Sequence, residues 1–356
     1  MSDIEKLISF AVAQRASDLH LSVGSPPILR VDGKLIPIKE LEALTSHKTQ
    51  ELIFSILTDT QRRQFEENLE LDFSFTATIL HRVRVNIHRQ RGMVEAAMRL
   101  VSSKIRTIQE LHLPEAVSDL ACRHNGLVLI TGPTGVGKTT TLAAMVELIN
   151  QEKEYLIVTI EDPIEYVHAN KKSIVKQMEV YSDTHSFAEA LRRALRQDPN
   201  VIVVGEMRDL ETIATALTAA ETGHLVLATL HTPDASQTID RVIDVFPPHQ
   251  QAQIRIQLAG ALQGIVSQLL CPRADGPGRI VATEVLMATP AVRNVIRQRE
   301  TQQIQSLIQT GAAYKMQTMD KSLATLFGQG LINRSDALIY MKEPDRLSIL
   351  AGRKTT

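Results

Sequence analysis

A glycine-rich stretch in the middle of the chain has the residue types and spacing of a phosphate-binding loop. It runs from Gly132 to Thr140 and fits the pattern G-x-x-x-x-G-K-S/T. A short apolar run at 127–130 precedes it, and residues 141–149 have the apolar spacing of a helix. Glycines allow backbone N–H groups to turn toward phosphate oxygens at the positive end of the following helix. The stretch therefore predicts binding of a nucleoside triphosphate.

The residues of this loop have separate expected parts in binding. We expect Lys138 to reach the outer phosphates and the Thr139 hydroxyl to coordinate Mg²⁺. A chance glycine-rich turn is the alternative, and the complete motif between a strand and a helix argues against it. The predicted nucleotide-binding residues are Gly132, Pro133, Thr134, Gly135, Val136, Gly137, Lys138, Thr139 and Thr140.

Acidic residues follow two further apolar runs. Glu206 is the first carboxylate after the run 201–204, and a strand beside a phosphate loop commonly supplies such a group to Mg²⁺ and the attacking water. We expect Glu206 to position or activate that water. The alternative is that Glu206 caps the next helix, but Asp209 is better placed for that role.

Glu161 and Asp162 end another predicted strand and face the ligand crevice of a parallel sheet. We expect them to hold Mg²⁺ through waters, with a solvated turn as the alternative.

Two histidines bracket the apolar run 225–230. A histidine at a strand end is more often an ordinary surface residue. Gly223 and Thr232 beside this pair nevertheless indicate a tight active-site loop that senses the phosphate state. His224 and His231 are both candidates, and His231 is better placed because it follows the carboxyl end of its strand.

The elements that must position these residues fall into two groups. Residues 1–101 mix helical stretches with strand-like runs, including 82–89 and 94–101, and this order indicates an antiparallel sheet flanked by helices. Strands and helices alternate regularly from residue 115 onward, and the strands are apolar throughout, as in a parallel sheet covered on both faces. Residues 102–114 are predicted to form a linker, and the part after Pro290 is expected to be mostly helical.

Composition narrows the possible functions. A chain of 356 residues suggests two domains, and its 44% hydrophobic residues suffice for packed cores. A net charge of −1, the absence of Trp and 4% aromatic residues disfavour a nucleic-acid motor. Two distant cysteines, Cys122 and Cys271, make a structural zinc site unexpected. No apolar run approaches the roughly 18 residues of a membrane span, so we expect a cytoplasmic protein.

The order and the residue sequences of the four motif segments resemble those of the secretion and pilus motor ATPases. This family carries a Walker A loop, an acidic box, a Walker B box and a histidine box. The similarity extends to its amino-terminal signature at 16–21, to a carboxyl-terminal motif associated with retraction at 291–297, and to the segment 316–323. It is strongest to the type IV pilus retraction motors. The motif reads Ala-Val-Arg-Asn-Val where Ala-Ile-Arg-Asn-Leu is commoner, so a PilU-like retraction paralogue stays open.

The resemblance implies an α/β fold with a PAS-like domain at 1–101 and a RecA-like P-loop ATPase domain with a helical carboxyl-terminal part at 115–356. It implies hydrolysis of ATP with Mg²⁺ by a homohexamer that drives pilus retraction and twitching motility. The implied location is cytoplasmic, peripherally associated with the inner-membrane pilus machinery. The implied partners are a PilC-like platform protein and a PilU-like paralogue, without nucleic acid or direct membrane insertion.

The resemblance also assigns arginines on the amino-terminal strands. Arg82 and Arg84 share one face of the run 82–89, and Arg99 lies on the next run. Solvent-facing arginines are the commoner outcome on such a sheet. Related secretion ATPases, however, carry two arginines in matching strands that reach a neighbouring subunit's nucleotide. We therefore expect Arg84 and Arg99 to act in trans, with Arg82 and Arg91 as weaker candidates.

Three other functions compete with retraction. The first is a motor for pilus assembly, secretion or DNA transfer; the missing four-cysteine zinc segment and missing extra amino-terminal domain argue against the first two. The second is a nucleotide-dependent regulator with little turnover, which the intact Lys138, Thr139 and Glu206 disfavour. The third is the nucleic-acid motor already disfavoured by charge and composition.

Overall fold

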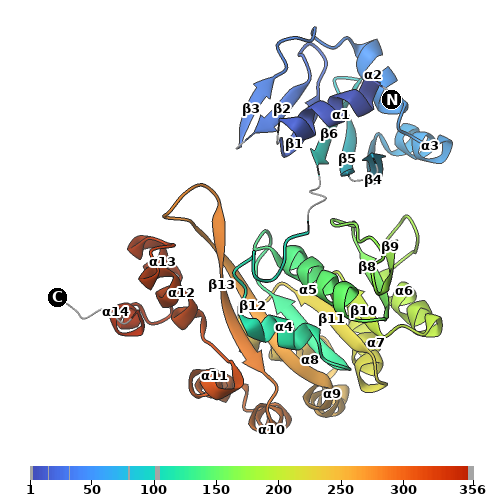
Figure 1. Cartoon of the computed structure of the whole chain (residues 1–356). Coiled ribbons are helices and arrows are strands. Elements are labelled where there is room, and N and C mark those ends of the chain that lie inside the picture. The colour runs from blue at the N-terminus through green and yellow to red at the C-terminus, as the bar shows by residue number, and fades with distance from the viewer. Residues whose placement is uncertain (1–2, 15, 32, 79–80, 101–104, 352–356) are drawn as a thin grey trace. The chain divides into compact units, whose positions relative to one another are not determined.

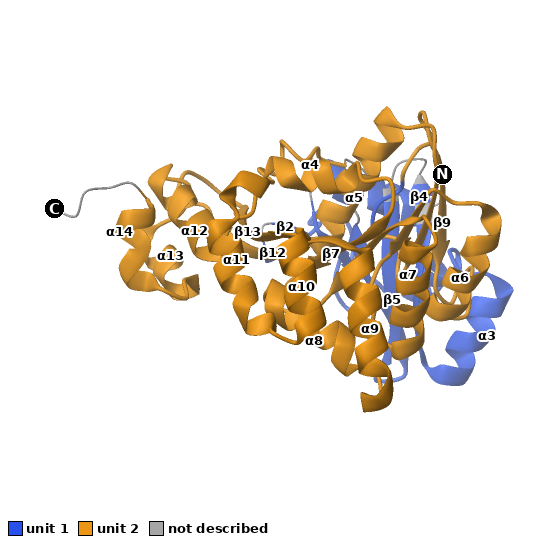
Figure 2. Cartoon of the chain, turned by 90° about the horizontal axis from the view of Figure 1, so that it is seen from below, with its two compact units in different colours: residues 1–104, 165–167 blue, residues 105–164, 168–356 orange. Residues whose placement is uncertain are grey.

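The computed structural model describes residues 3–14, 16–31, 33–78, 81–100 and 105–351. The chain forms two compact units, which Figure 2 distinguishes by colour. Unit 1 comprises residues 1–104 and 165–167, and unit 2 comprises the rest of the chain. The predicted end of the first domain at residue 101, and the first three residues of the predicted linker, lie outside the described residues.

Unit 1 is built on a six-stranded sheet with the order β3-β2-β1-β6-β5-β4 (Figure 1). All neighbouring strands in it are antiparallel. The strands are β1 (Asp18–Leu21), β2 (Ile28–Val31), β3 (Lys34–Pro37), β4 (Glu70–Thr78), β5 (His81–Gln90) and β6 (Met93–Leu100). The helices are α1 (Asp3–Ala13), α2 (Ser46–Phe54) and α3 (Asp59–Asn68). The predicted PAS-like arrangement, an antiparallel sheet with flanking helices, is confirmed.

Strand β5 shows how the sequence builds this sheet. Val83, Val85 and Ile87 are fully buried, whereas Arg84 between them is exposed. Successive side chains of a strand point to opposite faces, so the β-branched residues fill the core while the arginine stands on the outer face. The alternation therefore places the Arg84 side chain on the exposed face of the strand.

Unit 2 is built on a seven-stranded sheet with the order β13-β12-β7-β11-β10-β8-β9. Its neighbouring pairs are parallel except for β12 and β13. The strands are β7 (Gly126–Thr131), β8 (Leu156–Glu161), β9 (Ile174–Glu179), β10 (Val201–Val204), β11 (Leu225–Leu230), β12 (Leu262–Pro272) and β13 (Arg279–Met287). The expected parallel RecA-like sheet is confirmed, whereas β9, β12 and β13 are not predicted by the patterns above.

Helices cover both faces of this sheet, so the central strands β7, β10 and β11 are buried at every position. The carboxyl ends of β7, β8, β10 and β11 lie at one edge, and the candidate loops follow them. The covering helices are α4 (Glu115–Ala121), α5 (Lys138–Glu152), α6 (Phe187–Ala194), α7 (Leu210–Glu221), α8 (Ala235–Asp244) and α9 (Pro248–Ala261).

The carboxyl-terminal part is helical, as predicted. Part of it forms a small core of its own against β12 and β13, in which Cys271 is buried; Cys122 and Cys271 are both free thiols. None of the described helices is long and apolar enough to cross a membrane. The helices are α10 (Pro290–Gln298), α11 (Ile304–Thr310), α12 (Met319–Gly328), α13 (Arg334–Tyr340) and α14 (Leu347–Leu350). Short 3₁₀ turns lie at Leu195–Gln197, Thr301–Gln303, Ala312–Tyr314 and Pro344–Arg346.

Candidate active site

The predicted phosphate loop joins the carboxyl end of β7 to the start of α5. Gly132, Gly135 and Gly137 have φ values of 137°, 81° and 91°, a backbone region that residues with a Cβ rarely adopt. A Cβ on Gly132 would lie 2.5 Å from the carbonyl oxygen of Gln268 on β12. The loop is therefore fixed by backbone geometry and by close contact with the neighbouring strand.

Lys138 is buried at the mouth of this loop. Its Nζ donates to the carbonyl oxygens of Gly132 at 2.7 Å and Pro133 at 3.0 Å. The residue is also the first of α5, where free N–H groups and the helix dipole favour an anion. Thr139 and Thr140 follow in the same turn. The loop thus combines a fixed cation with a helix amino terminus, the chemistry that binds phosphates.

Glu206 stands one residue beyond Gly205, at the carboxyl end of β10. Its Oε1 lies 3.1 Å from His231 Nε2, and its Oε2 accepts a hydrogen bond from Arg208 Nη2 at 2.7 Å. Burial raises the pKa of Glu206, but the Arg208 hydrogen bond and the charges of His231 and Arg208 outweigh it and leave the pKa below its ordinary value. The carboxylate is therefore ionised at neutral pH and able to accept a hydrogen bond from water.

His231 connects this carboxylate to the phosphate loop. It follows β11, the strand between β7 and β10, so its ring lies between their two loops. Its Nδ1 is 3.4 Å from Thr134 Oγ1 and 3.5 Å from Lys138 Nζ, while its Nε2 faces Glu206. The fold therefore brings together three segments that the sequence predicts separately: the phosphate loop, Glu206 and His231.

The acidic pair lies at the end of β8, the strand next to β10. Glu161 Oε1 accepts hydrogen bonds from Thr159 Oγ1 at 2.6 Å and Gln177 Nε2 at 3.0 Å, so its carboxylate is oriented. Asp162 is exposed. No group of three or more His, Cys, Asp or Glu among the described residues could hold a metal unaided. Mg²⁺ usually takes one or two carboxylates together with phosphate oxygens and waters, and Thr139, Glu161 and Asp162 fit that mode of binding.

His224 lies at the other end of β11. Its Nδ1 is 3.0 Å from the Ala219 carbonyl oxygen and 3.3 Å from Thr222 Oγ1. The phosphate loop follows the carboxyl end of β7, which pairs in parallel with β11, so His224 lies at the opposite edge of the sheet. Within one chain the structure does not bring His224 to His231, and its catalytic role stays a prediction.

Arg84 and Arg99 are direct partners across β5 and β6 of unit 1. Arg99 Nε donates to Asp18 Oδ1 at 3.0 Å, although its side chain is 69% exposed. Arg82 Nη2 donates to Ser74 Oγ, and Arg91 lies in the β5–β6 turn with φ 49°. The two preferred arginines therefore form one exposed pair, and their catalytic role stays a prediction.

The sequence patterns do not single out Arg208 and Asp18, which contact the candidate residues Glu206 and Arg99. The position of Arg208, two residues after Glu206, is a local signal that could have revealed it. Asp18 is buried and contacts Arg99 across 81 residues of sequence, which no local pattern reveals. It lies within the amino-terminal signature that the resemblance singles out.

Comparisons with known proteins show the family of this chain. A family model described as type II/IV secretion system protein matches residues 1–276 of the chain. The chain belongs to this family. Among family members, the type IV pilus retraction ATPase PilT of Pseudomonas aeruginosa is 50% identical over 343 residues, which cover 96% of this chain and 99% of that protein.

A further relative and a solved structure also match the chain along nearly its whole length. The type IV pilus ATPase PilU of the same organism is 40% identical over 348 residues, covering 98% of this chain and 91% of that protein. A crystal structure of the retraction motor PilT with bound ADP matches with a TM-score of 0.91 and 49% identity, over 98% of this chain and all of that one. Family membership, this likeness and the complete phosphate loop make the chain a nucleotide-binding ATPase.

Proposed function

We propose that the chain is a hexameric motor that couples ATP hydrolysis to type IV pilus retraction and so to twitching motility. The observation that carries the proposal is the likeness to a retraction ATPase along almost the whole chain, at 50% identity. The convergence of Lys138, Glu206 and His231 in one centre supports it, because a motor needs turnover as well as binding. An intact hydrolytic centre also disfavours a regulator that binds nucleotide without turnover.

In the proposed mechanism each residue acts on the charge that develops during phosphoryl transfer. Lys138 holds the outer phosphates, and Glu206 orients the attacking water. His231 responds to the terminal phosphate, since its ring contacts the loop with one nitrogen and Glu206 with the other. Thr139, Glu161 and Asp162 would hold Mg²⁺, which would supply positive charge to the phosphates. Arg84 and Arg99 of one subunit reach the nucleotide of the next.

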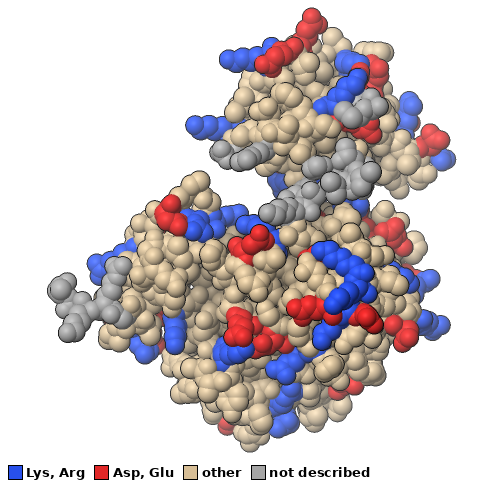
Figure 3. All heavy atoms as spheres, in the orientation of Figure 1, with Lys and Arg blue, Asp and Glu red and all other residues tan. Residues whose placement is uncertain are grey.

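We further propose a cytoplasmic location at the inner-membrane pilus machinery, with a PilC-like platform protein as the partner. Residues 1–101 and 115–356 of the chain would form its two domains, joined by the linker 102–114. Lys and Arg side chains are interspersed with Asp and Glu on the face in Figure 3, in keeping with the net charge of −1. This distribution supports a protein partner rather than a phosphate backbone.

A retraction paralogue is the second candidate. The specific observation in its favour is the 40% identity to the PilU ATPase over nearly the whole chain. The higher identity to the PilT ATPase places the paralogue second.

The proposal is tested by deleting the gene and scoring surface pili and twitching. A retraction motor predicts excess immobile pili and loss of twitching, both reversed by the wild-type gene. Bald cells would indicate an assembly motor. Normal pilus number with normal twitching would contradict a non-redundant retraction role.

A further inference from the structure

The loop that carries His231 is anchored at its far end to the start of α8. Asp234 is the N-cap of that helix and is buried; its Oδ1 accepts the backbone N–H of Gln237 at 2.9 Å. Thr232 shares a hydroxyl hydrogen bond of 2.7 Å with Thr238. The three residues between His231 and α8 therefore have a position set by contacts rather than by chain flexibility.

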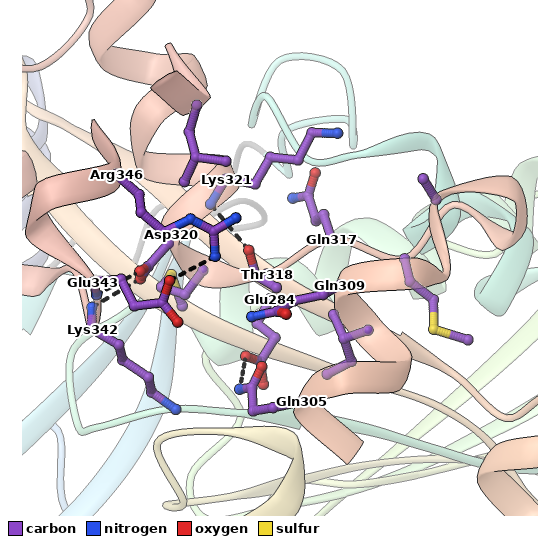
Figure 4. Close-up of a pocket in the computed structure, with 15 residues that line it drawn as sticks. Glu284, Gln305, Gln309, Gln317, Thr318, Asp320, Lys321, Lys342, Glu343 and Arg346 are labelled. Atoms are coloured by element: carbon purple, nitrogen blue, oxygen red, sulfur yellow. Dashed lines mark hydrogen bonds and ion pairs between the residues drawn. The ribbon is translucent and has the colours of Figure 1, made fainter. Parts of the chain in front are cut away.

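A lysine from the carboxyl-terminal helices completes this anchor. Lys342 Nζ lies 2.8 Å from Asp234 Oδ2, although 108 residues separate the two in sequence. The lysine follows α13, and its backbone N–H, like that of Glu343, donates to the carboxylate of Asp320 in α12, as Figure 4 shows. The ammonium group is thus held in place by a short turn clamped onto α12.

The Asp234–Lys342 pair differs from an ordinary surface ion pair. The Asp234 side chain is only 11% exposed, whereas that of Lys342 is 55% exposed. Burial raises the pKa of Asp234, but the backbone hydrogen bond from Gln237 and the Lys342 ammonium keep the pKa low. Removing the cation leaves a largely buried carboxylate without its charged partner, which costs more than losing a solvated pair.

Among the described residues, Lys342 is the cation that pairs with the Asp234 carboxylate. Lys342 borders a cavity of about 280 Å³, lined also by Glu284, Asp320 and Arg346 (Figure 4). Arg346 is paired with Glu343, and Glu284 already accepts hydrogen bonds from the Ala235 N–H and from Gln305. Lys342 is therefore the cation that holds Asp234 from the carboxyl-terminal side.

We propose that Lys342 is a positioning residue for ATP hydrolysis. Through its contact with Asp234, it holds the His231 loop in place beside Glu206 and the phosphate loop. Turnover then depends on the docking of the carboxyl-terminal helices onto α8. The inference rests on the proposed role of His231 in the centre. It adds a residue more than a hundred positions from His231 in the sequence, which acts on the centre through Asp234.

The test measures steady-state ATP turnover by the full-length chain and its Lys342→Met variant. We expect kcat to fall about 10-fold with KM for ATP nearly unchanged, since a displacement of about 1 Å at a catalytic group can cost roughly 10²-fold. Lys342→Arg should restore most of the rate because it keeps the charge. Lys321→Met is the matched control: Lys321 lines the same cavity without contacting Asp234, and its rate should equal that of the wild type.

A second variant covers the case in which Lys342→Met fails to fold. Asp234→Asn keeps a good helix cap while removing the charge, and it should lower kcat by a similar factor. If both single variants fold, the double variant should lose no more than either single one, because one interaction is removed in each case. A rate within twofold of wild type for a folded Lys342→Met or Asp234→Asn protein overturns the inference if His231→Ala is strongly impaired. A His231→Ala protein with wild-type turnover would instead refute the proposed site role from which the inference starts.

Discussion

At the scale of single residues, the arrangement around Glu206 suggests what this carboxylate does. Two cationic or polarisable groups, Arg208 and His231, hold its two oxygens and lower its pKa. A carboxylate with a lowered pKa is a weak proton acceptor but a well-oriented hydrogen-bond acceptor. We therefore favour alignment of the attacking water over proton abstraction as its contribution.

Substitutions at the two central residues should separate binding from hydrolysis. Lys138→Ala should abolish tight ATP binding because the buried ammonium is the cation of the phosphate loop. Glu206→Gln should keep binding and lose about 10²–10⁴-fold in turnover, the usual contribution of such a group. Nucleotide titration and a steady-state ATPase assay measure the two effects. Turnover within a few-fold of wild type in Glu206→Gln would remove Glu206 from this role.

Arg208→Ala should change the pH dependence of turnover. Arg208 lowers the pKa of Glu206, so its removal raises that pKa. Activity requires the ionised carboxylate; the acid limb of the kcat–pH profile should therefore move to higher pH. Arg196→Ala, an exposed arginine elsewhere on unit 2, is the control and should leave the profile unchanged. An unshifted profile in Arg208→Ala would show that Glu206 does not set the acid limb.

At the scale of elements, the sequence predicts the parts with regular patterns. The apolar strands β7, β10 and β11 and the loops after them are predicted, because burial on both sheet faces leaves a continuous apolar run. β12 is missed because buried polar residues interrupt its pattern. Ser267 hydrogen-bonds Thr131 at 2.8 Å, and Gln268 Nε2 donates to Thr141 Oγ1 at 2.7 Å. These side chains support the elements on either side of the phosphate loop.

In the candidate site, too, some residues are predictable from local sequence patterns and others are not. Lys138, Glu206 and His231 are predictable because each directly follows a patterned strand or glycine loop. The pairs Asp18–Arg99 and Asp234–Lys342 are not, since their members come from distant segments and become neighbours only through the fold. Long-range charge pairing depends on tertiary packing, which local periodicity does not encode.

Helix α10 carries a prediction of its own. Val292, Val295 and Ile296 are buried, and the Arg293 guanidinium donates to the carbonyl oxygens of Ala259 and Gly260 near the end of α9. We expect α10 to transmit motion of the ring to the pilus machinery, with Arg293 fixing it to α9. Arg293→Ala should therefore spare ATPase activity but stop retraction, measured as loss of twitching.

The matched variant is Arg297→Ala, which removes an exposed cation from the same helix. Comparing the two strains separates loss of the α9 anchor from loss of charge. Wild-type twitching in the Arg293→Ala strain would reject the idea, and a loss of ATPase activity in that variant would indicate ordinary structural support.

At the scale of the whole molecule, the exposed Arg84–Arg99 pair suggests that the active site is completed between subunits. Identical subunits arranged head to tail present the same surface to each neighbour, so one subunit can supply an arginine to the next. Such a group is worth about 10³–10⁵ in rate in well-studied cases. Arg84→Ala and Lys138→Ala proteins should each be nearly inactive alone. Mixed rings should regain part of the ATPase rate, because some interfaces then combine an intact loop with an intact arginine.

Mixing must be verified by pull-down of differently tagged subunits before the rates are compared. The absence of any recovery in verified mixed rings would count against action in trans.

The central claim is that turnover at the Lys138–Glu206–His231 centre drives pilus retraction. Its most direct test is to image labelled pili in a deletion strain complemented with the wild type, with His231→Ala or with Glu206→Gln, each expressed at equal level, and to measure the retraction speed of single pili. We predict that this speed falls in the same order as the ATPase rates of the purified proteins and is lost in the Glu206→Gln strain. Wild-type retraction speed in a strain whose only copy is a protein shown to be hydrolysis-deficient would contradict the claim.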